Sequence, residues 1–376
     1  MVKLGTVISQ AKNIRCGEHN YPVLSMTMHD GLIFQDDKFK KVIASANRSE
    51  YKVVYRNQLV VSFPIDEGVL AAQRITDVGI VSPAYTIWDI DQAKILPEFL
   101  EYALRCDRSI NYYKAKLRGS TARRRSLPTP TLLEHTIPLP AIDAQRYILE
   151  IIHKSRNVLE TRKIQLQKLD MLVRARFVEM FGDPVSNSYG LPEATLPELG
   201  KFGRGVSKHR PRNDPRLLDG EYPLVQTGDV ANASLYITSY NSTYSELGLK
   251  QSKMWSKGTL CITIAANIAK TAILEFDACF PDSVVGFIAN EKTNNIFIHY
   301  WFSFFQAILE SQAPESAQKN INLKILSELK VIVPEKEKQN EFVDFVHQVD
   351  KSKDSVQKAL DEAQLLFDSL MQQYFG

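Results

Sequence analysis

Two clusters of basic residues carry the strongest chemical signal in the sequence. The first places four arginines among eight residues, with small residues that permit a tight backbone: Arg118, Gly119, Ser120, Thr121, Arg123, Arg124 and Arg125. The second places six cations in the sixteen residues 201–216: Lys201, Arg204, Lys208, Arg210, Arg212 and Arg216. Such cations bind phosphates, and an arginine can also reach a base edge. The clusters therefore predict contact with nucleic acid, the alternative for each being a solvated loop.

A third polar run stands in the second half of the chain, where the first arginine cluster stands in the first half. Its side chains able to bond base edges or phosphates are Gln318, Lys319 and Asn320. The net charge of the whole chain is only +3 and its pI is about 8.5. A role in binding nucleic acid would therefore depend on these local patches and not on the overall charge.

Motifs for catalysis are absent from the sequence. It contains no GxxxxGK[ST], GxGxxG, HExxH or GxSxG pattern, and its seven histidines are scattered. The four cysteines form no CxxC pair, so we expect neither a metal site nor a disulfide framework, and a reducing cytoplasm suits them best. No signal peptide and no apolar run of membrane-spanning length is present. We expect a cytoplasmic protein with no catalytic residues.

The second half of the chain repeats the first at an offset of 194 residues. Residues 132–182 align with 326–376 without a gap, and nine of the 51 pairs are identical. The identical pairs include Gln145/Gln339 and Phe181/Phe375, and the apolar pattern around them also matches. A repeat of this length predicts two modules that end in the same kind of helix.

Two long helices are predicted, from about 142 to 180 and from about 339 to 374, because neither segment contains Pro or Gly. Apolar residues recur every seven positions in each, which is typical of a coiled-coil seam. The residues that we expect at this helix interface are Ile152, Leu159, Leu166, Val173, Phe342, Val349, Val356, Leu360 and Leu370. The alternative is that each helix packs only on its own module.

The remaining sequence predicts two mixed α/β modules. Short β-rich runs such as 51–55, 59–63 and 84–90 precede an amphipathic helix that begins near Pro97, and residues 183–332 repeat this scheme. The expected fold class is mixed α/β, with two duplicated modules whose long helices pack as an antiparallel coiled coil. The expected organisation is a first module at 1–138, a helix at 139–182, a second module at 183–332 and a helix at 333–376.

These features together resemble the specificity subunit of type I restriction–modification systems. The resemblance rests on Gly119-Ser120, on Ile137-Pro-Leu-Pro140 with Gln145, on the helix that ends Met180-Phe-Gly-Asp-Pro184, and on the echo Val331-Ile-Val-Pro334 with Gln339. It implies that each module reads one half of a split DNA target while the antiparallel helices hold the modules apart. It also implies two methyltransferase subunits, two restriction/translocase subunits, and S-adenosylmethionine, ATP and Mg²⁺ bound by those partners. The chain itself would bind no cofactor and catalyse no step.

Three alternatives stay open at this point. One is a recognition subunit of a related methylation-based defence system that does not cleave DNA. The second is a nuclease whose carboxylates are dispersed along the chain. The third is a structural coiled-coil adaptor, which would leave the arginine clusters and the duplicated modules unexplained.

Overall fold

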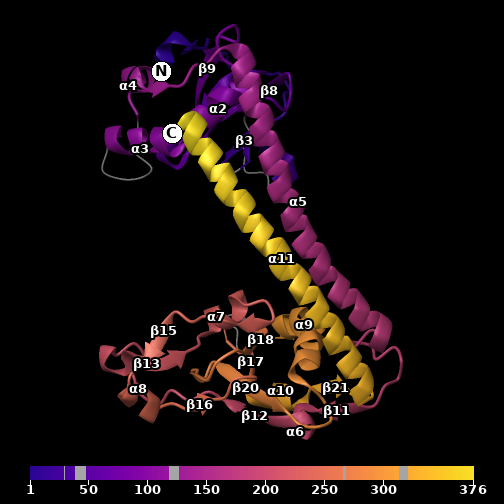
Figure 1. Cartoon of the computed structure of the whole chain (residues 1–376). Coiled ribbons are helices and arrows are strands. Elements are labelled where there is room, and N and C mark those ends of the chain that lie inside the picture. The colour runs from indigo at the N-terminus through magenta and orange to yellow at the C-terminus, as the bar shows by residue number, and fades with distance from the viewer. Residues whose placement is uncertain (29, 39–47, 118–126, 266–267, 313–320) are drawn as a thin grey trace. The chain divides into compact units, whose positions relative to one another are not determined.

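The structure is a computed structural model that describes residues 1–28, 30–38, 48–117, 127–265, 268–312 and 321–376 (Figure 1). It divides into two compact units. Unit 1 comprises 1–163 together with 357–376, and unit 2 comprises 164–356. Each unit therefore contains one α/β module, the beginning of the long helix that follows this module, and the end of the other long helix.

Unit 1 holds the first module. Its strands are β1 (Val2–Lys3), β2 (Ile8–Gln10), β3 (Leu24–Thr27), β4 (Gly31–Phe34), β5 (Lys52–Tyr55), β6 (Leu59–Val61), β7 (Leu70–Ala72), β8 (Val78–Val81), β9 (Thr86–Ile90) and β10 (Thr136–Ile137). Its helices are α1 (Gln35–Lys38), α2 (Pro97–Arg105), α3 (Asp107–Lys116), α4 (Thr129–Glu134) and the start of α5 (Ile142–Phe181). The main sheet has the order β2-β9-β6-β7, and all its pairings are antiparallel.

Unit 2 holds the second module. Its strands are β11 (Glu193–Thr195), β12 (Gly200–Arg204), β13 (Leu218–Leu224), β14 (Tyr236–Ile237), β15 (Ser242–Tyr244), β16 (Met254–Trp255), β17 (Leu260–Thr263), β18 (Thr271–Leu274), β19 (Ala278–Cys279), β20 (Val284–Ala289) and β21 (Lys330–Ile332). Its helices are α6 (Leu196–Leu199), α7 (Thr227–Asn232), α8 (Glu246–Lys250), α9 (Asn295–Gln312), α10 (Leu323–Glu328) and the start of α11 (Lys336–Phe375). The main sheet has the order β12-β20-β17-β18-β14.

The two main sheets share one plan. Strands β2, β9, β6 and β7 occupy the places of β12, β20, β17 and β18, and Leu59 pairs with Trp88 as Leu260 pairs with Phe287. The central strands β6 and β17 are buried along their whole length. Alternate residues of a strand face opposite sides of a sheet, so both faces of each sheet are covered. The residues that begin these strands, Leu59 and Leu260, belong to the larger core cluster of their unit.

A buried glutamine fastens the start of each long helix to its module. Gln145 Nε2 donates to the carbonyls of Lys94 (2.9 Å) and Pro140 (2.8 Å), and its Oε1 accepts from the Leu96 backbone N–H (2.9 Å). Gln339 is bonded in the same manner, to the carbonyls of Lys292 and Pro334 and to the Thr293 hydroxyl. Both glutamines are fully buried. Because a buried amide needs partners, the repeated glutamine has a structural cause.

The end of each long helix packs in the other unit. Phe375, at the end of α11, is buried in unit 1 against Phe99 and Tyr102 of α2. Phe181, at the end of α5, is buried in unit 2 against Phe297 of α9. The first part of α5 therefore accompanies the last part of α11 in unit 1, and the reverse holds in unit 2. This arrangement makes the helices antiparallel, as the sequence predicted.

The residues that we expected at the helix interface differ in burial. Five are buried: Ile152, Leu159, Val173, Phe342 and Val349. Four are partly exposed: Leu166, Val356, Leu360 and Leu370. Helix α5 ends where the Phe-Gly-Asp-Pro stretch indicated, since Gly182 has a φ of +74°, a conformation that favours glycine after a helix.

Candidate nucleic-acid interface

The basic cluster of the second module begins in β12, with Lys201 and Arg204, and continues on the segment that follows, which is fixed by hydrogen bonds. Gln251 Oε1 accepts from the backbone N–H groups of Lys208 (2.7 Å) and His209 (3.1 Å). The Ser252 hydroxyl donates to the carbonyl of Val206 (2.8 Å). These bonds anchor the segment to residues 251–252, just beyond α8. Residues 206–209 of the cluster are therefore anchored, and its contact with nucleic acid stays a prediction.

Asp214 braces the far end of the same segment. Its carboxylate accepts from Arg216 Nη2 (2.7 Å) and from His209 Nε2 (3.0 Å), and Arg216 also donates its backbone N–H (3.0 Å). The hydrogen bonds from Arg216, with a smaller one from His209, lower the pKa of the Asp214 carboxyl from its usual value. Asp214 is therefore ionised at neutral pH and keeps both partners in place.

Five cations of this cluster fall into two groups: Arg204, Lys208, Arg210, Arg212 and Arg216. Arg210 and Arg212 both form ion pairs with Asp282, and Arg216 pairs with Asp214. Arg204 and Lys208 are exposed, and no described acidic residue lies within ion-pair distance of either. Arg204 and Lys208 therefore keep their full charge available for phosphates, whereas the paired arginines have their charge partly neutralised and their direction constrained.

A pocket of about 280 Å³ opens beside this segment. Its lining comes from four separate stretches of chain and is mostly uncharged: Ser207, Arg212, Asn213, Leu218, Leu224, Gln226, Thr227, Ser242, Tyr244, Pro281 and Ser283. Arg212 is the charged side chain among these. The pocket thus combines an apolar floor with hydroxyl and amide groups, which can both donate and accept hydrogen bonds.

The sequence did not point to the pocket residues. Gln226, Ser242 and Ser283 carry no motif, and they meet only because the fold brings β15 and the segments that follow β13 and precede β20 together. The sequence feature nearest to the pocket was the basic cluster at 201–216, because Ser207, Arg212 and Asn213 of this stretch line the pocket.

The basic cluster of the first module cannot be placed. Arg118, Ser120, Thr121, Arg123, Arg124 and Arg125 lie outside the described residues, as do Gln318, Lys319 and Asn320 of the second module. Their assignment to nucleic acid therefore stays a prediction.

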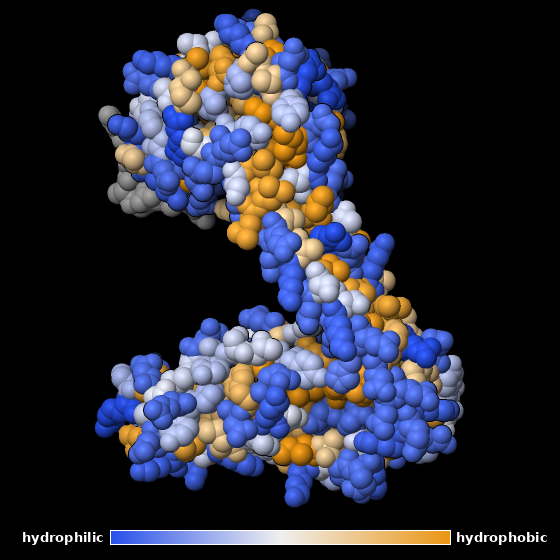
Figure 2. All heavy atoms as spheres, in the orientation of Figure 1, coloured by the Kyte–Doolittle hydropathy of each residue, from blue (hydrophilic) through white to orange (hydrophobic). Residues whose placement is uncertain are grey.

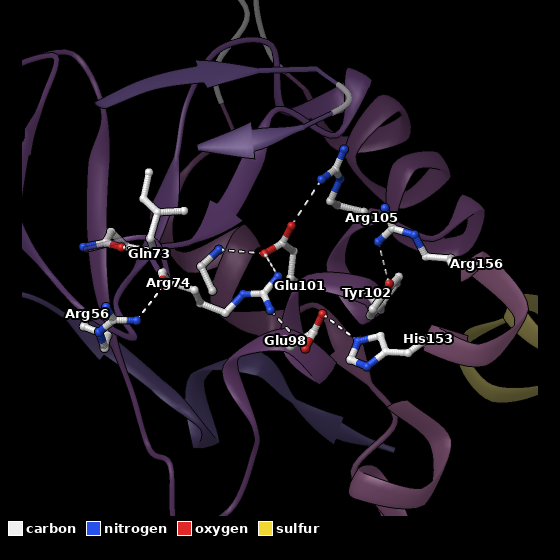
Figure 3. Close-up of polar contacts among 11 residues, drawn as sticks. Arg56, Gln73, Arg74, Glu98, Glu101, Tyr102, Arg105, His153 and Arg156 are labelled. Atoms are coloured by element: carbon white, nitrogen blue, oxygen red, sulfur yellow. Dashed lines mark hydrogen bonds and ion pairs between the residues drawn. The ribbon is translucent and has the colours of Figure 1, made fainter. Parts of the chain in front are cut away.

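Other arginines of the first module form an internal polar network around α2 (Figure 3). Arg74 pairs with Glu98 (3.0 Å), and Arg105 pairs with Glu101 (3.2 Å). Glu101 also accepts from the backbone N–H of Ala72 (3.1 Å) in β7.

The same network reaches α5. His153 lies 2.9 Å from Glu98, and Arg156 donates to the Tyr102 hydroxyl (2.9 Å). These contacts hold α2 between the sheet and the start of α5 (Figure 3). We assign these arginines a structural role, because their side chains form ion pairs and hydrogen bonds within unit 1.

Within the described ranges, no group of three or more histidine, cysteine, aspartate or glutamate residues is arranged to hold a metal ion. Nor does any helix among the residues that the structure places have the length and hydropathy needed to cross a membrane.

Comparison with known proteins gives one consistent result. The family model for the type I restriction modification DNA specificity domain matches residues 193–364, from β11 into α11. A protein of Methanocaldococcus jannaschii, named as the specificity subunit of the type I restriction enzyme MjaX, is 25% identical over 287 residues. The alignment covers 71% of this chain and 66% of that protein, so the chain spans just under two thirds of that relative's length.

Solved structures show the same fold. A chain from a structure that concerns complex assembly and conformational transition of the type I R-M system is 16% identical, with a TM-score of 0.64 over 100% of this chain and 96% of that chain. The S subunit of the type I restriction–modification system from M. genitalium is 15% identical, with a TM-score of 0.55 over 100% and 95%. Residues 193–364 thus match the type I restriction modification DNA specificity domain, and the whole chain, with its duplicated modules and paired long helices, shares the fold of these solved structures.

Proposed function

We propose that the chain recognises a split DNA target, one half with each module, and takes no catalytic part in the methylation or cleavage that follows. The observation that supports this most directly is the duplication of one sheet plan, β2-β9-β6-β7 and β12-β20-β17-β18, each followed by a helix of 40 residues. Two modules of one plan suit two separate half-sites. The braced basic segment of the second module supplies a positively charged surface suited to phosphates.

The partners follow from the same proposal. Two methyltransferase subunits, which use S-adenosylmethionine, and two restriction/translocase subunits, which use ATP and Mg²⁺, would assemble on this chain. The target adenine would leave the DNA stack and enter the pocket of a methyltransferase subunit. This chain would then contribute position and specificity, and its partners would contribute the chemistry.

The split target is tested with the chain assembled with its methyltransferase partner. Sequencing of modified bases in cells that carry the system should show one two-part sequence with an unspecified spacer. Duplexes in which either half is scrambled should lose specific binding, by on the order of 10³-fold or more. The purified chain alone should neither methylate nor cleave such a duplex. A continuous target, or turnover by the isolated chain, would contradict the proposal.

The long helices suggest where the methyltransferase subunits dock. Figure 2 shows hydrophobic surface along parts of these helices. On α5, the neighbours Met171 and Leu172 are 67% and 48% exposed, and on α11 Leu365 and Leu366 are 68% and 56% exposed. The two pairs are equivalent in the repeat, 194 residues apart. Exposed apolar pairs of this kind mark interaction sites, and two equal sites suit two copies of one partner.

We expect each docking pair to control one methyltransferase subunit. Met171→Ser/Leu172→Ser should reduce the complex from two methyltransferase subunits per chain to one, and Leu365→Ser/Leu366→Ser should do the same. The fourfold variant should bind none. Native mass spectrometry of the assembled complex measures this stoichiometry.

The controls for this experiment are internal. Because all four side chains are exposed, the substitutions should shift the free energy of unfolding by no more than about 0.5 kcal/mol. Unchanged stoichiometry in the fourfold variant would place the docking surface elsewhere.

A further inference from the structure

The arginines that pair with Asp282 differ in how many of their donors are occupied. Arg210 Nη1 donates to the carbonyls of Ser207 (2.6 Å) and His209 (2.8 Å), and its Nη2 lies 3.5 Å from Asp282 Oδ2. Arg210 therefore acts as a brace within the segment. Arg212 contacts the other oxygen of Asp282 through Nη2, and no further hydrogen bond of this side chain occurs among the described residues. The remaining donors of Arg212 stay free for a ligand.

Asp282 gives Arg212 a fixed direction. The carboxylate uses one oxygen for each arginine, and Arg210 is itself anchored to the backbone. The Arg212 side chain is 47% exposed, so its contact with Asp282 leaves the outer part of the guanidinium open to solvent. It also lines the pocket beside the segment, as do Asn213 and Ser283.

This arrangement suits a base edge better than a phosphate. A phosphate contact depends mainly on net charge, whereas a base contact depends on where the donors point. The carboxylate of Asp282 offsets the charge of Arg212 but constrains its direction, and the rest of the pocket lining is uncharged. Lys208 lies on the same segment and Arg204 at the end of β12, and no described acidic residue offsets their charges, so both are available for phosphates.

We propose that Arg212 reads the O6/N7 edge of a guanine in the half of the target bound by the second module, and that Asp282 is the positioning residue for this contact. The proposal rests on the proposed function and names one of its specificity determinants. Arginine bonded to guanine O6 and N7 is the commonest specific contact in the major groove. In the first module, the sheet register matches Phe287 with Trp88 and so aligns Asp282 with Pro83. The described residues of the first module therefore have no carboxylate at the position that corresponds to Asp282.

The test uses the full chain assembled with its methyltransferase partner and a duplex that carries the target mapped by sequencing modified bases. Each base of the second half is replaced in turn, and binding and methylation are measured for the wild type, Arg212→Ala, Arg212→Lys and Asp282→Asn. For the wild type, one guanine position should discriminate. In Arg212→Ala, this discrimination should fall by about 5- to 150-fold at that position, while the other positions keep theirs.

The two milder variants separate positioning from charge. Arg212→Lys keeps the positive charge but loses the two parallel donors of the guanidinium, so it should reduce the discrimination at the same guanine position. Asp282→Asn keeps Arg212 but removes the carboxylate that orients it. It should reduce the discrimination at the guanine position only in part. The slope of log K against log salt concentration should change by less than one unit. Lys208→Ala is the matched control from the same segment. It should weaken binding to all sequences alike and reduce the salt slope by about one.

Three outcomes would overturn the inference. One is a second half-site without guanine. Another is an Arg212→Ala variant that weakens all sequences equally, since this behaviour belongs to a phosphate contact. The third is unaltered specificity in both Arg212→Lys and Asp282→Asn, which also decides the matter if Arg212→Ala fails to fold. Loss of the two-part target in the wild type would instead contradict the proposed function.

Discussion

Replacing Phe177 with alanine is expected to lower the free energy of unfolding by about 3–5 kcal/mol, the range for truncation of a buried aromatic residue. Phe177 is fully buried in unit 2, near the end of α5. Its ring lies 5.2 Å from Phe297 of α9 and 5.3 Å from Phe342 of α11, centroid to centroid. One side chain thus joins both long helices to the module, and its removal leaves a cavity that three elements share.

Met171→Ala is the matched control for this experiment. It removes a large apolar side chain from the same helix, but Met171 is 67% exposed, so we expect a change of no more than about 0.5 kcal/mol. Urea unfolding of the full chain, with unchanged slope m, measures both variants. If Phe177→Ala proved as stable as Met171→Ala, the packing of α5 on α9 and α11 described here would be wrong.

The repeat made the architecture predictable. Gln145/Gln339 and Phe181/Phe375 are identical pairs because each performs one structural task twice: the glutamine binds the start of a long helix to its module, and the phenylalanine inserts the end of that helix into the other unit's core. The long helices were predictable because the apolar periodicity and the absence of Pro and Gly are local properties of the sequence.

The candidate interface was predictable only in part. The cations of 201–216 were visible as a cluster, but their roles were not, because the ion pairs to Asp282 and the bonds to Gln251 join segments 40 or more residues apart. A run of basic residues does not show which members are paired within the protein. Such pairing decides whether an arginine can offer a ligand its net charge, a fixed direction of its donors, or neither.

The burial of the helix interface also departs from its sequence pattern. Ile152, Leu159, Val173, Phe342 and Val349 are buried, whereas four other heptad positions are partly exposed: Leu166, Val356, Leu360 and Leu370. The modules add their own side chains around the helix ends, as Phe99 and Tyr102 do around Phe375. A heptad pattern predicts that each apolar position faces the other helix, but it does not predict how far side chains of the modules cover that position.

A charged residue stands inside this interface in unit 2. Lys353 of α11 is only 14% exposed, and its Nζ lies 2.6 Å from Asp170 of α5 and 3.6 Å from Asp350 of α11. The second carboxylate oxygen of Asp350 is buried, with no hydrogen-bond partner among the described residues. Burial raises the pKa of the Asp350 carboxyl, and Lys353 opposes this shift. Lys353 therefore compensates a carboxylate that would otherwise be buried without a partner.

The first half of the chain has an apolar residue at the matching place. The offset of 194 residues aligns Lys353 with Leu159 and Asp350 with Arg156. Leu159 is buried in unit 1, so an apolar side chain is compatible with this position of the repeat. The charged group at 353 thus makes the two ends of the helix pair chemically different, which disfavours pairing of two identical helices.

We expect Lys353→Met to destabilise the chain by about 3 kcal/mol at pH 8, at the low end of the range for breaking a buried ion pair, because Asp170 is itself exposed. The loss has a defined pH dependence. A carboxyl whose folded pKa is raised contributes stability that is present below its unfolded pKa, near 4, and lost as the pH rises through the folded pKa. Without Lys353 the pKa of Asp350 rises further, so the deficit should shrink as the pH falls from 8 toward 4.

The double variant Lys353→Met/Asp350→Leu separates a lost ion pair from lost packing. It removes the uncompensated carboxylate and replaces the pair with apolar side chains, which is often neutral or stabilising. At pH 8 its free energy of unfolding should return to the wild-type value or exceed it, and the pH-dependent deficit should vanish. Urea unfolding of all three proteins at pH 5 and pH 8 measures both effects. A Lys353→Met variant as stable as the wild type at pH 8 would show that solvent, and not Lys353, compensates Asp350. A restored double variant would instead show that the fold does not require the charge, so that its value lies in making the two helix ends different.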